Sequence, residues 1–274
     1  MNRSRTAQWK DLGFLAAFIT AYELGMALCL VALALIPFSA NWKSLPTWQG
    51  LLLSFAIQLL VYLLVTAAVW AAYGLLRLHL NIGGLLDPRP LKPRQIPQEM
   101  LRGISTCVIY AVYTFICLRL SSGLWPTSWL AGAAQLAVFL ALYDFWFYWS
   151  HCALHTRAFA AFHGTHHRSV RVTPWSVHSL HPVEALINQL PFLIFVLAWP
   201  TGFGMIVLFQ VVIMFMTASG HSNYDPFAQS SGLPRAKAFW RFHQRHHQLG
   251  RGNFGFMGLH WDLVFGTAQG RKAE

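Results

Sequence analysis

The sequence contains six long apolar stretches, at residues 12–36, 51–75, 104–123, 129–149, 184–200 and 202–219. A helix needs about 20 apolar residues to cross the hydrocarbon core of a bilayer, and the first four stretches reach that length. Only 11% of the residues are charged, against about a quarter in soluble domains. We therefore predict an all-α integral-membrane bundle with four long spans. The last two stretches are shorter and form either a full span pair or a shallow hairpin.

No linker, repeat or low-complexity tract divides the chain. We predict a single integral-membrane domain over residues 1–274, in which residues 1–128 supply the N-terminal spans and residues 129–274 carry the histidine-rich region. The first apolar stretch follows three basic residues, as in a signal peptide, but it is too long for one. We therefore expect it to be retained as the first span.

The basic residues are distributed asymmetrically about the apolar stretches. In one orientation the cytosolic segments are 1–11, 76–103, 150–183 and 220–274, which hold 18 of the 20 Lys and Arg residues. Cytosolic loops carry an excess of Lys and Arg, so we predict that the N-terminus and the histidine-rich segments face the cytosol. The net charge of +11 then follows from membrane topology and does not indicate nucleic-acid binding, because no basic face is periodic.

Of the 13 histidines, 12 lie after residue 150. His151 and His155 form HxxxH, His163, His166 and His167 form HxxHH, and His243, His246 and His247 form a second HxxHH. Residues three or four apart share one face of a helix, so each motif aims its imidazoles at one point. Imidazole binds Zn, Cu, Fe and Ni, so the ligand type does not identify the metal. Zinc takes four ligands at most in such sites, whereas about ten clustered histidines indicate at least two ions.

Two acidic residues accompany these motifs. Asp144 lies in the fourth apolar stretch on the same helical stripe as His151, so it either orients that imidazole or makes a structural hydrogen bond to another span. Pro182 is well placed as the first residue of a helix, and Glu184 either supports that helix start or backs a metal ligand. His79 and His260 stay outside the candidate ligand set.

From about residue 144 to residue 267 the chain carries the segments HCALH, HGTHH, TPWSVHSLHPVE, GHSNYD, HQRHH, NFG and WDLVFGT in that order. In these motifs it resembles the fatty acid hydroxylase and sterol desaturase superfamily. The TPW segment is most similar to the sterol C-5 desaturase branch. The resemblance covers somewhat under half of the chain and falls within the 129–274 region, whereas the first hundred residues carry no motif of the family.

The resemblance implies a set of metal ligands and supporting residues. The implied ligands are His151, His155, His163, His166, His167, His181, His243, His246 and His247, with His178 and His221 at positions where members of the family often have histidine. Asn253 and Asp262 match recurring polar positions and are expected to support ligands. With Asp144 and Glu184 these are the candidate residues around the metals.

The implied activity is that of a membrane-bound non-haem di-iron oxidoreductase with two iron ions. It would use O₂ as co-substrate to hydroxylate or desaturate a C–H bond of a sterol, a fatty-acyl chain or a related lipid taken from the bilayer. The chain has no CxxC motif of the kind that holds an iron–sulfur cluster, so electrons would come from a separate NAD(P)H reductase through a donor of the ferredoxin or cytochrome b5 type. A basic cytosolic surface with Arg235, Lys237, Arg241 and Arg245 could bind such an acidic donor.

Two other classes of function fit a histidine-rich membrane protein. A zinc-dependent membrane hydrolase would be expected to carry HExxH, which the sequence lacks. A metal transporter or sensor would place its ligands along a path near the middle of the bilayer, whereas these motifs lie in loops and helix ends on one side. The oligomeric state does not follow from the sequence.

Overall fold

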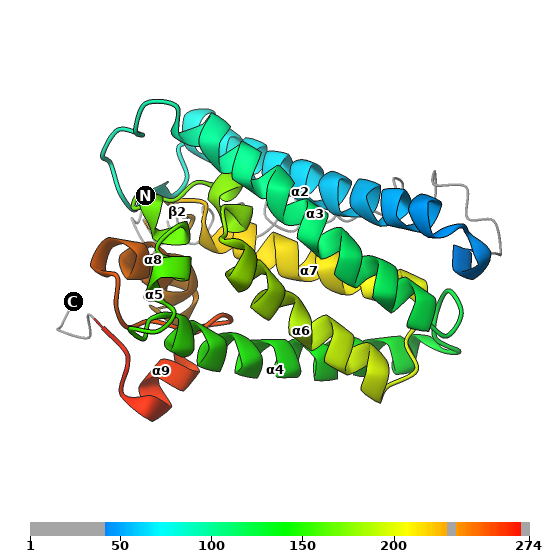
Figure 1. Cartoon of the computed structure of the whole chain (residues 1–274). Helices are drawn as coiled ribbons and strands as arrows, with labels where there is room; N and C mark the ends of the chain where they lie inside the picture. The colour runs from blue at the N-terminus through cyan, green and yellow to red at the C-terminus, as the bar shows by residue number, and fades with distance from the viewer. Residues whose placement is uncertain (1–41, 229–233, 270–274) are drawn as a thin grey trace, which may run out of the picture.

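The computed structural model describes residues 42–228 and 234–269, and this part of the chain is mainly helical (Figure 1). Four of its helices are long and apolar enough to cross a membrane: α2 (Thr47–Leu78), α3 (Gln95–Leu120), α4 (Trp129–Leu154) and α7 (Phe203–Gly220). A fifth apolar helix, α6 (Pro182–Ala198), is shorter. The predicted all-α membrane bundle is confirmed, while the predicted span at 12–36 lies outside the described residues.

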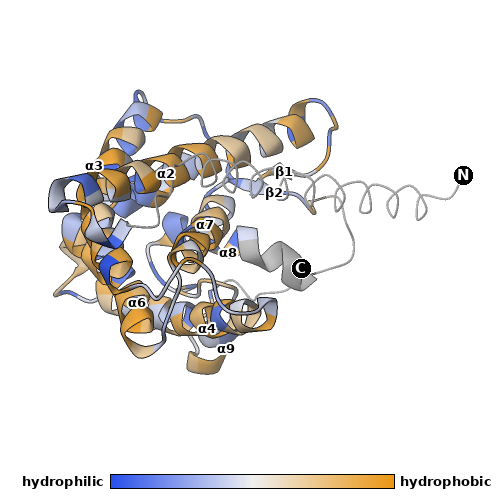
Figure 2. Ribbon diagram, turned by 90° about the vertical axis from the view of Figure 1, so that its right-hand side faces the viewer, coloured by the Kyte–Doolittle hydropathy of each residue, from blue (hydrophilic) through white to orange (hydrophobic). Residues whose placement is uncertain are grey.

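Helix α7 occupies the middle of the bundle, and α2, α3, α6 and α4 are arranged around it (Figures 1 and 2). In the most apolar window of α7, 78% of the residues are buried, against 22% in α4. The Phe139 ring of α4 stacks on the Phe209 ring of α7 at 4.2 Å between centroids, which fixes the contact between these two helices. The other helices carry hydrophobic residues outward, as expected for surfaces that contact lipid (Figure 2).

Helices α6 and α7 correspond to the last two apolar stretches of the sequence. Pro182 is the first residue of α6, as predicted, and the His181 ring accepts a hydrogen bond from the Val183 backbone N–H at 3.2 Å. The helix ends at the Trp199-Pro200 pair, because proline cannot continue the hydrogen-bond ladder. Helix α7 then has 18 residues, enough to count as a span by its own length.

One proline lies inside α6 and changes how this helix meets α4. Pro191 has no N–H, so the carbonyl of Ile187, four residues earlier, loses its partner within the helix. The Trp146 indole of α4 donates a hydrogen bond to that carbonyl at 3.0 Å. A polar group in an apolar bundle is therefore satisfied across two helices, which fixes α6 against α4.

Most of the remaining elements gather at the histidine-rich end of the bundle (Figure 1). They are α5 (Ala160–His163), η2 (His166–Arg168), η3 (Pro174–His178), α8 (Pro234–Leu249) and α9 (His260–Phe265), whereas η1 (Trp42–Ser44) precedes α2 at the other end. A two-stranded antiparallel sheet joins β1 (Gly84–Leu85) to β2 (Tyr224–Asp225), with Gly84 opposite Asp225 and Leu85 opposite Tyr224. This sheet ties the α2–α3 loop to the segment that follows α7.

Candidate metal centre

The structure brings nine histidines together in two neighbouring groups at this end of the bundle. The first group is His151, His155, His163, His167 and His246, and the second is His166, His221, His243 and His247. Within each group, one nitrogen from every residue lies within 4.8 Å of all the others. The ligand candidates come from the end of α4, the α5–η2 segment, the residue after α7, and α8. Segments far apart in the sequence therefore complete each group.

In the first group the Nε2 atoms face one another. The Nε2–Nε2 distance is 3.1 Å between His151 and His163 and 3.0 Å between His167 and His246. Two nitrogens bound to one ion at about 2.1 Å lie about 3.0 Å apart at a right angle and about 3.4 Å apart at the tetrahedral angle. Five donors at these distances match an ion with more than four neighbours better than they match tetrahedral zinc.

The second group has the same character with four donors. His221 Nε2 lies 3.1 Å from His166 Nε2 and 2.9 Å from His243 Nε2, and His247 Nε2 lies 3.1 Å from His243 Nε2. The His167 and His247 rings are 4.7 Å apart between centroids, so the two groups adjoin. This arrangement is suited to two ions held side by side.

The hydrogen bonds of the Nδ1 atoms show that the Nε2 atoms, which face one another, carry the lone pairs. His151 Nδ1 lies 3.0 Å from the Phe254 carbonyl, His221 Nδ1 lies 2.8 Å from the Thr217 carbonyl, and His246 Nδ1 lies 2.7 Å from the Gly252 carbonyl. A carbonyl only accepts, so Nδ1 carries the proton in these rings and Nε2 carries the lone pair. Lone pairs that face one another at about 3 Å repel unless a cation lies among them, so the donor set fits metal ions.

The pKa values of these rings favour the same state. Burial lowers the pKa of His155, His167 and His221 to about 4 each. Burial and the neighbouring imidazoles lower the pKa of His166 and His247 well below the usual histidine value. The rings are therefore neutral at pH 7, which is the form that binds a metal ion.

Glu184 backs a ligand candidate, which was one of its two predicted roles. Its Oε1 accepts a hydrogen bond from His163 Nδ1 at 2.9 Å, and the carboxylate is buried at 3% exposure. A carboxylate behind an imidazole raises the basicity of that ligand and fixes its orientation. Among the described residues, Glu184 Oε2 has no hydrogen-bond partner.

The predicted contact between Asp144 and His151 is wrong, and the alternative, a hydrogen bond to another span, is not observed either, because the partners of Asp144 lie in the 257–261 segment. Asp144 Oδ2 accepts from His260 Nε2 and from the Trp261 indole at 2.7 Å each, and Oδ1 accepts from the Met257 N–H at 2.9 Å. Seven residues along a helix correspond to about 10 Å, which is too far for the Asp144 carboxylate to reach His151. Asp144 instead holds the 257–261 segment against α4.

Asn253 and Asp262 act on the loop that follows α8. Asn253 has a φ of 54° and binds the backbone of Gln269 through its side chain, without contacting a histidine. Asp262 is fully buried and accepts from the N–H groups of Phe254 and Gly255 at 2.8 Å each. This loop contains the two carbonyls that accept hydrogen bonds from His151 and His246, so Asn253 and Asp262 support these ligand candidates through the backbone.

His178 and His181 lie outside both groups, which reduces the candidate ligand set from eleven histidines to nine. The His178 ring stacks on the Tyr62 ring at 5.0 Å between centroids, and its Nδ1 lies 3.9 Å from Cys107 Sγ. His181 caps α6 and packs beside the Phe162 ring. Burial lowers the pKa of His178 to about 3, so it is a neutral ring in the wall of the site.

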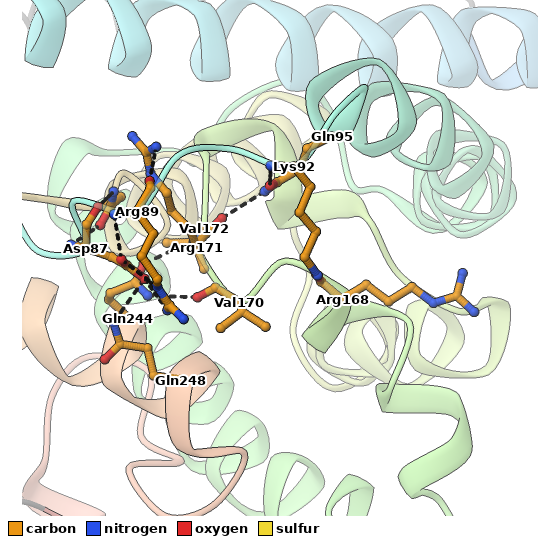
Figure 3. Close-up of polar contacts among 11 residues, drawn as sticks. Asp87, Arg89, Lys92, Gln95, Arg168, Val170, Arg171, Val172, Gln244 and Gln248 are labelled. Atoms are coloured by element: carbon orange, nitrogen blue, oxygen red, sulfur yellow. Dashed lines mark hydrogen bonds and ion pairs between the residues drawn. The ribbon is translucent and has the colours of Figure 1, made fainter.

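Gln244 is a residue that sequence reasoning missed. It lies between two ligand candidates of α8, is 2% exposed, and binds the segment after the first HxxHH motif (Figure 3). Its Nε2 donates to the Val170 carbonyl at 2.8 Å, and its Oε1 accepts from the Val172 N–H at 3.2 Å. A polar residue directed inward within an HxxHH motif was the only available signal.

The loop between α2 and α3 binds the same segment from the other side (Figure 3). Lys92 Nζ donates to the Arg168 carbonyl at 3.0 Å, and Gln95 Nε2 donates to the Arg171 carbonyl at 2.8 Å. Gln248 of α8 donates to Asp87 Oδ2 at 3.1 Å in the same loop. The region that carries no family motif therefore contributes directly to the frame of the histidine cluster.

A cavity extends from the histidines into the membrane bundle. At one end its wall includes His151, His163, His166, His221 and His243, and further in it includes side chains of α2, α3, α6 and α7. Its volume is about 80 Å³. Such a narrow, largely apolar space beside a metal-binding group is suited to part of a lipid molecule.

A sequence model described as fatty acid hydroxylase matches residues 136–267. A Delta(7)-sterol 5(6)-desaturase of Leptosphaeria maculans is 29% identical over 191 residues, which cover 66% of this chain and 52% of that protein. Residues 136–267 are therefore a match to the fatty acid hydroxylase superfamily. This match confirms the resemblance seen in the motifs, and the matched region contains all nine histidines of the two groups.

Other relatives in this superfamily differ in the reaction that their names give. A lathosterol oxidase of Rattus norvegicus is 27% identical over 153 residues, covering 53% of this chain and 48% of that protein. A very-long-chain aldehyde decarbonylase GL1-8 of Oryza sativa subsp. indica is 33% identical over 174 residues, covering 59% of this chain and 61% of that protein. The match thus spans about half to three fifths of these relatives, and no solved structure matches the chain.

Proposed function

We propose that this protein is a membrane-bound di-iron oxidoreductase that hydroxylates or desaturates a lipid with O₂ and external electrons. The observation that supports it best is the pair of all-histidine groups, with five and four donors, at one end of a narrow cavity that extends into the membrane bundle. A group of five donors exceeds the number that zinc takes in hydrolase sites. Imidazole donors are also suited to iron.

In this proposal the first group holds one ion and the second group holds the other. Two iron ions bound there would supply the redox chemistry that directs O₂ against an unactivated C–H bond. Hydroxylation consumes O₂, two electrons and two protons and yields an alcohol and water, whereas desaturation yields an alkene and a second water. Glu184 and the backbone carbonyls hold the Nδ1 protons, so the rings keep their orientation while the charge of the site changes.

The lipid would reach the cavity from the side. A second hollow of about 440 Å³ lies on the outside of α4 and α6, and it shares Ser150 and Leu154 with the wall of the inner cavity. Phe145 and Trp149 line it and are 48% and 44% exposed. An apolar hollow that opens toward lipid and adjoins the inner cavity is a direct route from the bilayer to the histidines.

The metal groups and the N-terminus would face the cytosol, as the distribution of Lys and Arg predicts. Electrons would come from an external donor of the ferredoxin or cytochrome b5 type. Arg245 is exposed on α8 next to His246, whereas Arg241 is bound to Asp225 at 2.7 Å. An acidic donor could therefore approach α8 near the ligand candidates.

Metal analysis of the purified full-length protein tests this function. We expect about two irons per chain in the wild type, as the two groups require. His247→Ala should lower the iron content by about one and abolish oxidation of cellular lipids, measured by comparing the lipids of cells with and without the protein. His79→Ala is the matched control, because His79 is exposed and outside both groups, and it should leave iron and product unchanged.

The rival functions give different outcomes in the same experiment. Zinc alone, with hydrolysis of a lipid ester retained, would support a membrane hydrolase. Metal flux into liposomes that is lost in His166→Ala would support a transporter. Full oxidation activity in His247→Ala would contradict the assignment of the second group as metal ligands.

A further inference from the structure

The cavity is polar at the end that lies deepest in the bundle. Gln58 of α2, Gln189 of α6 and Gln210 of α7 all line it, and they are 2%, 5% and 6% exposed. Polar side chains inside a membrane bundle are costly unless they have partners, so their presence calls for a physical reason. Among the described residues, none of these glutamines forms a hydrogen bond with the histidine groups, so those groups do not supply that reason.

Gln210 lies far from the ligand candidates along its own helix. It precedes His221 by eleven residues on α7, and a helix rises about 1.5 Å per residue, so the two are separated by roughly 16 Å along the axis. A molecule that reaches from Gln210 to the histidines must therefore be on the order of 15 Å long. That is the scale of a lipid.

The hydrogen bonds around Gln210 fix its side-chain amide but leave its carbonyl oxygen without a donor. The side-chain N–H₂ groups of Gln58 and Gln210 both donate to Thr114 Oγ1 at 2.7 Å, which fixes the two amides. The carbonyl oxygens Oε1 of Gln210 and of Gln189 are buried and have no partner among the described residues. Both oxygens are acceptors, so a ligand group that satisfies them must donate a hydrogen bond.

The charged residues in the cavity wall indicate which kind of hydrogen-bond donor the ligand carries. No Lys or Arg lines the cavity in the described part of the chain, whereas the carboxylate of Glu184 does. A fatty acid carboxylate would face acceptor oxygens without a cation, which is unfavourable. A neutral hydroxyl donates a hydrogen bond and carries no charge.

We propose that the deep end of the cavity binds the hydroxyl group of an otherwise apolar lipid, which donates to Gln210 Oε1 and thereby places a carbon about 15 Å away beside the histidines. This inference rests on the proposed function only in that the carbon beside the histidines is the one to be oxidised; the binding of the hydroxyl group does not depend on that function. Gln210 is then a specificity-determining residue that selects alcohols over ethers, acids and hydrocarbons. The hydroxyl could belong to a straight-chain alcohol or to a sterol, and both present the same donor.

Binding to the purified full-length protein in lipid nanodiscs tests the proposal without requiring turnover. The probes are radiolabelled 1-hexadecanol and cholesterol, each compared with its own methyl ether, and palmitic acid. We expect at least one of the two alcohols to bind about tenfold more tightly than its ether, because the ether cannot donate a hydrogen bond. Palmitic acid should bind more weakly than hexadecanol. The arm that shows the preference identifies the lipid class.

Gln210→Leu should reduce the preference for alcohol over ether to less than about twofold. Gln135→Leu is the matched control, because Gln135 is also a buried glutamine with an unpartnered Oε1 but lies outside the cavity, where its Nε2 binds the Pro200 carbonyl; it should keep the wild-type preference. Equal binding of both alcohols and their ethers by the wild type would overturn the proposal, and that comparison requires no variant. An unchanged preference in a folded Gln210→Leu protein would also overturn it. If the wild-type protein prefers alcohols over ethers but oxidises no lipid, that result would count against the proposed function alone.

Discussion

At the scale of single residues, the arrangement of the histidine groups depends on side chains and backbone groups that are not ligand candidates. The Nδ1 atoms of the histidines donate to backbone carbonyls and to one carboxylate. The backbone that carries those carbonyls is held in turn by side chains such as Asp262, which accepts from the Phe254 N–H. Gln244 is the clearest case, because one buried amide holds the backbone on both sides of Arg171. Such supporting contacts are expected to change metal affinity by about 10–100-fold when they are removed.

Gln244→Leu tests this at the residue scale. The substitution leaves the Val170 carbonyl and the Val172 N–H without their buried partner, so we expect loss of stability of about 1–3 kcal/mol and faster metal release. The measurement is the rate of metal transfer to a chelator. Gln248→Leu is the control on the same helix, because Gln248 is exposed and its side chain donates a hydrogen bond to Asp87 and not to the segment that Gln244 holds. Equal release rates in both variants would contradict the role of Gln244.

At the scale of helices, α4 and α6 are joined through a carbonyl that a proline leaves free. Pro191 removes the N–H that would bind the Ile187 carbonyl, and Trp146 supplies the replacement. The contact lies beside the outer hollow, where Ile187 and Trp146 are both lining residues. This hydrogen bond therefore helps to set the relative position of the two helices that border the proposed lipid route.

A double-mutant cycle tests this contact. Trp146→Phe should lower the stability of the detergent-solubilised protein by about 1–2 kcal/mol, because the Ile187 carbonyl is left unpaired. Adding Pro191→Ala should recover much of that loss, since the new N–H can bind Ile187 within the helix. Thermal unfolding of the two single variants and the double variant measures the effect. Additive destabilisation would show that the hydrogen bond does not couple the helices.

At the scale of the whole molecule, the histidine cluster lies where four separate segments meet. Closing the groups therefore requires that the membrane bundle and the α8 segment are both folded. Because burial keeps these rings neutral in the folded state while they are protonated below about pH 6.5 in the unfolded state, the metal-free protein binds fewer protons when folded. Its stability should then rise with pH through this range.

We expect the metal-free protein to lose stability as the pH falls from 6.5 toward 4. His221 alone, whose pKa is lowered to about 4, would withdraw on the order of 3 kcal/mol over that window. Asp87, whose pKa is lowered to about 2 by its hydrogen bond with Arg89, stays ionised there and contributes little of the slope. Thermal midpoints of chelator-treated protein at several pH values give the measurement. A midpoint that is constant or rises toward pH 4.5 would be contrary to this expectation.

The sequence alone determined the class of fold and the location of the chemistry. Apolar stretches long enough for a bilayer predict helices, because backbone groups in lipid must be satisfied within the segment. The HxxxH and HxxHH spacings predict which imidazoles share a face, because that is a local property of a helix. For the same reason, Pro182 could be placed at the start of α6 from the sequence.

Only the tertiary structure decided which histidines meet and what stands behind them. The contact between His163 and Glu184 spans 21 residues, and that between His166 and His221 spans 55, so no local spacing encodes either. The same holds for Asp144, whose partners lie 113 to 117 residues away, and for the glutamines that line the cavity. Contacts between distant segments depend on how whole helices pack, and a pattern within one segment carries no information about the segment that will face it.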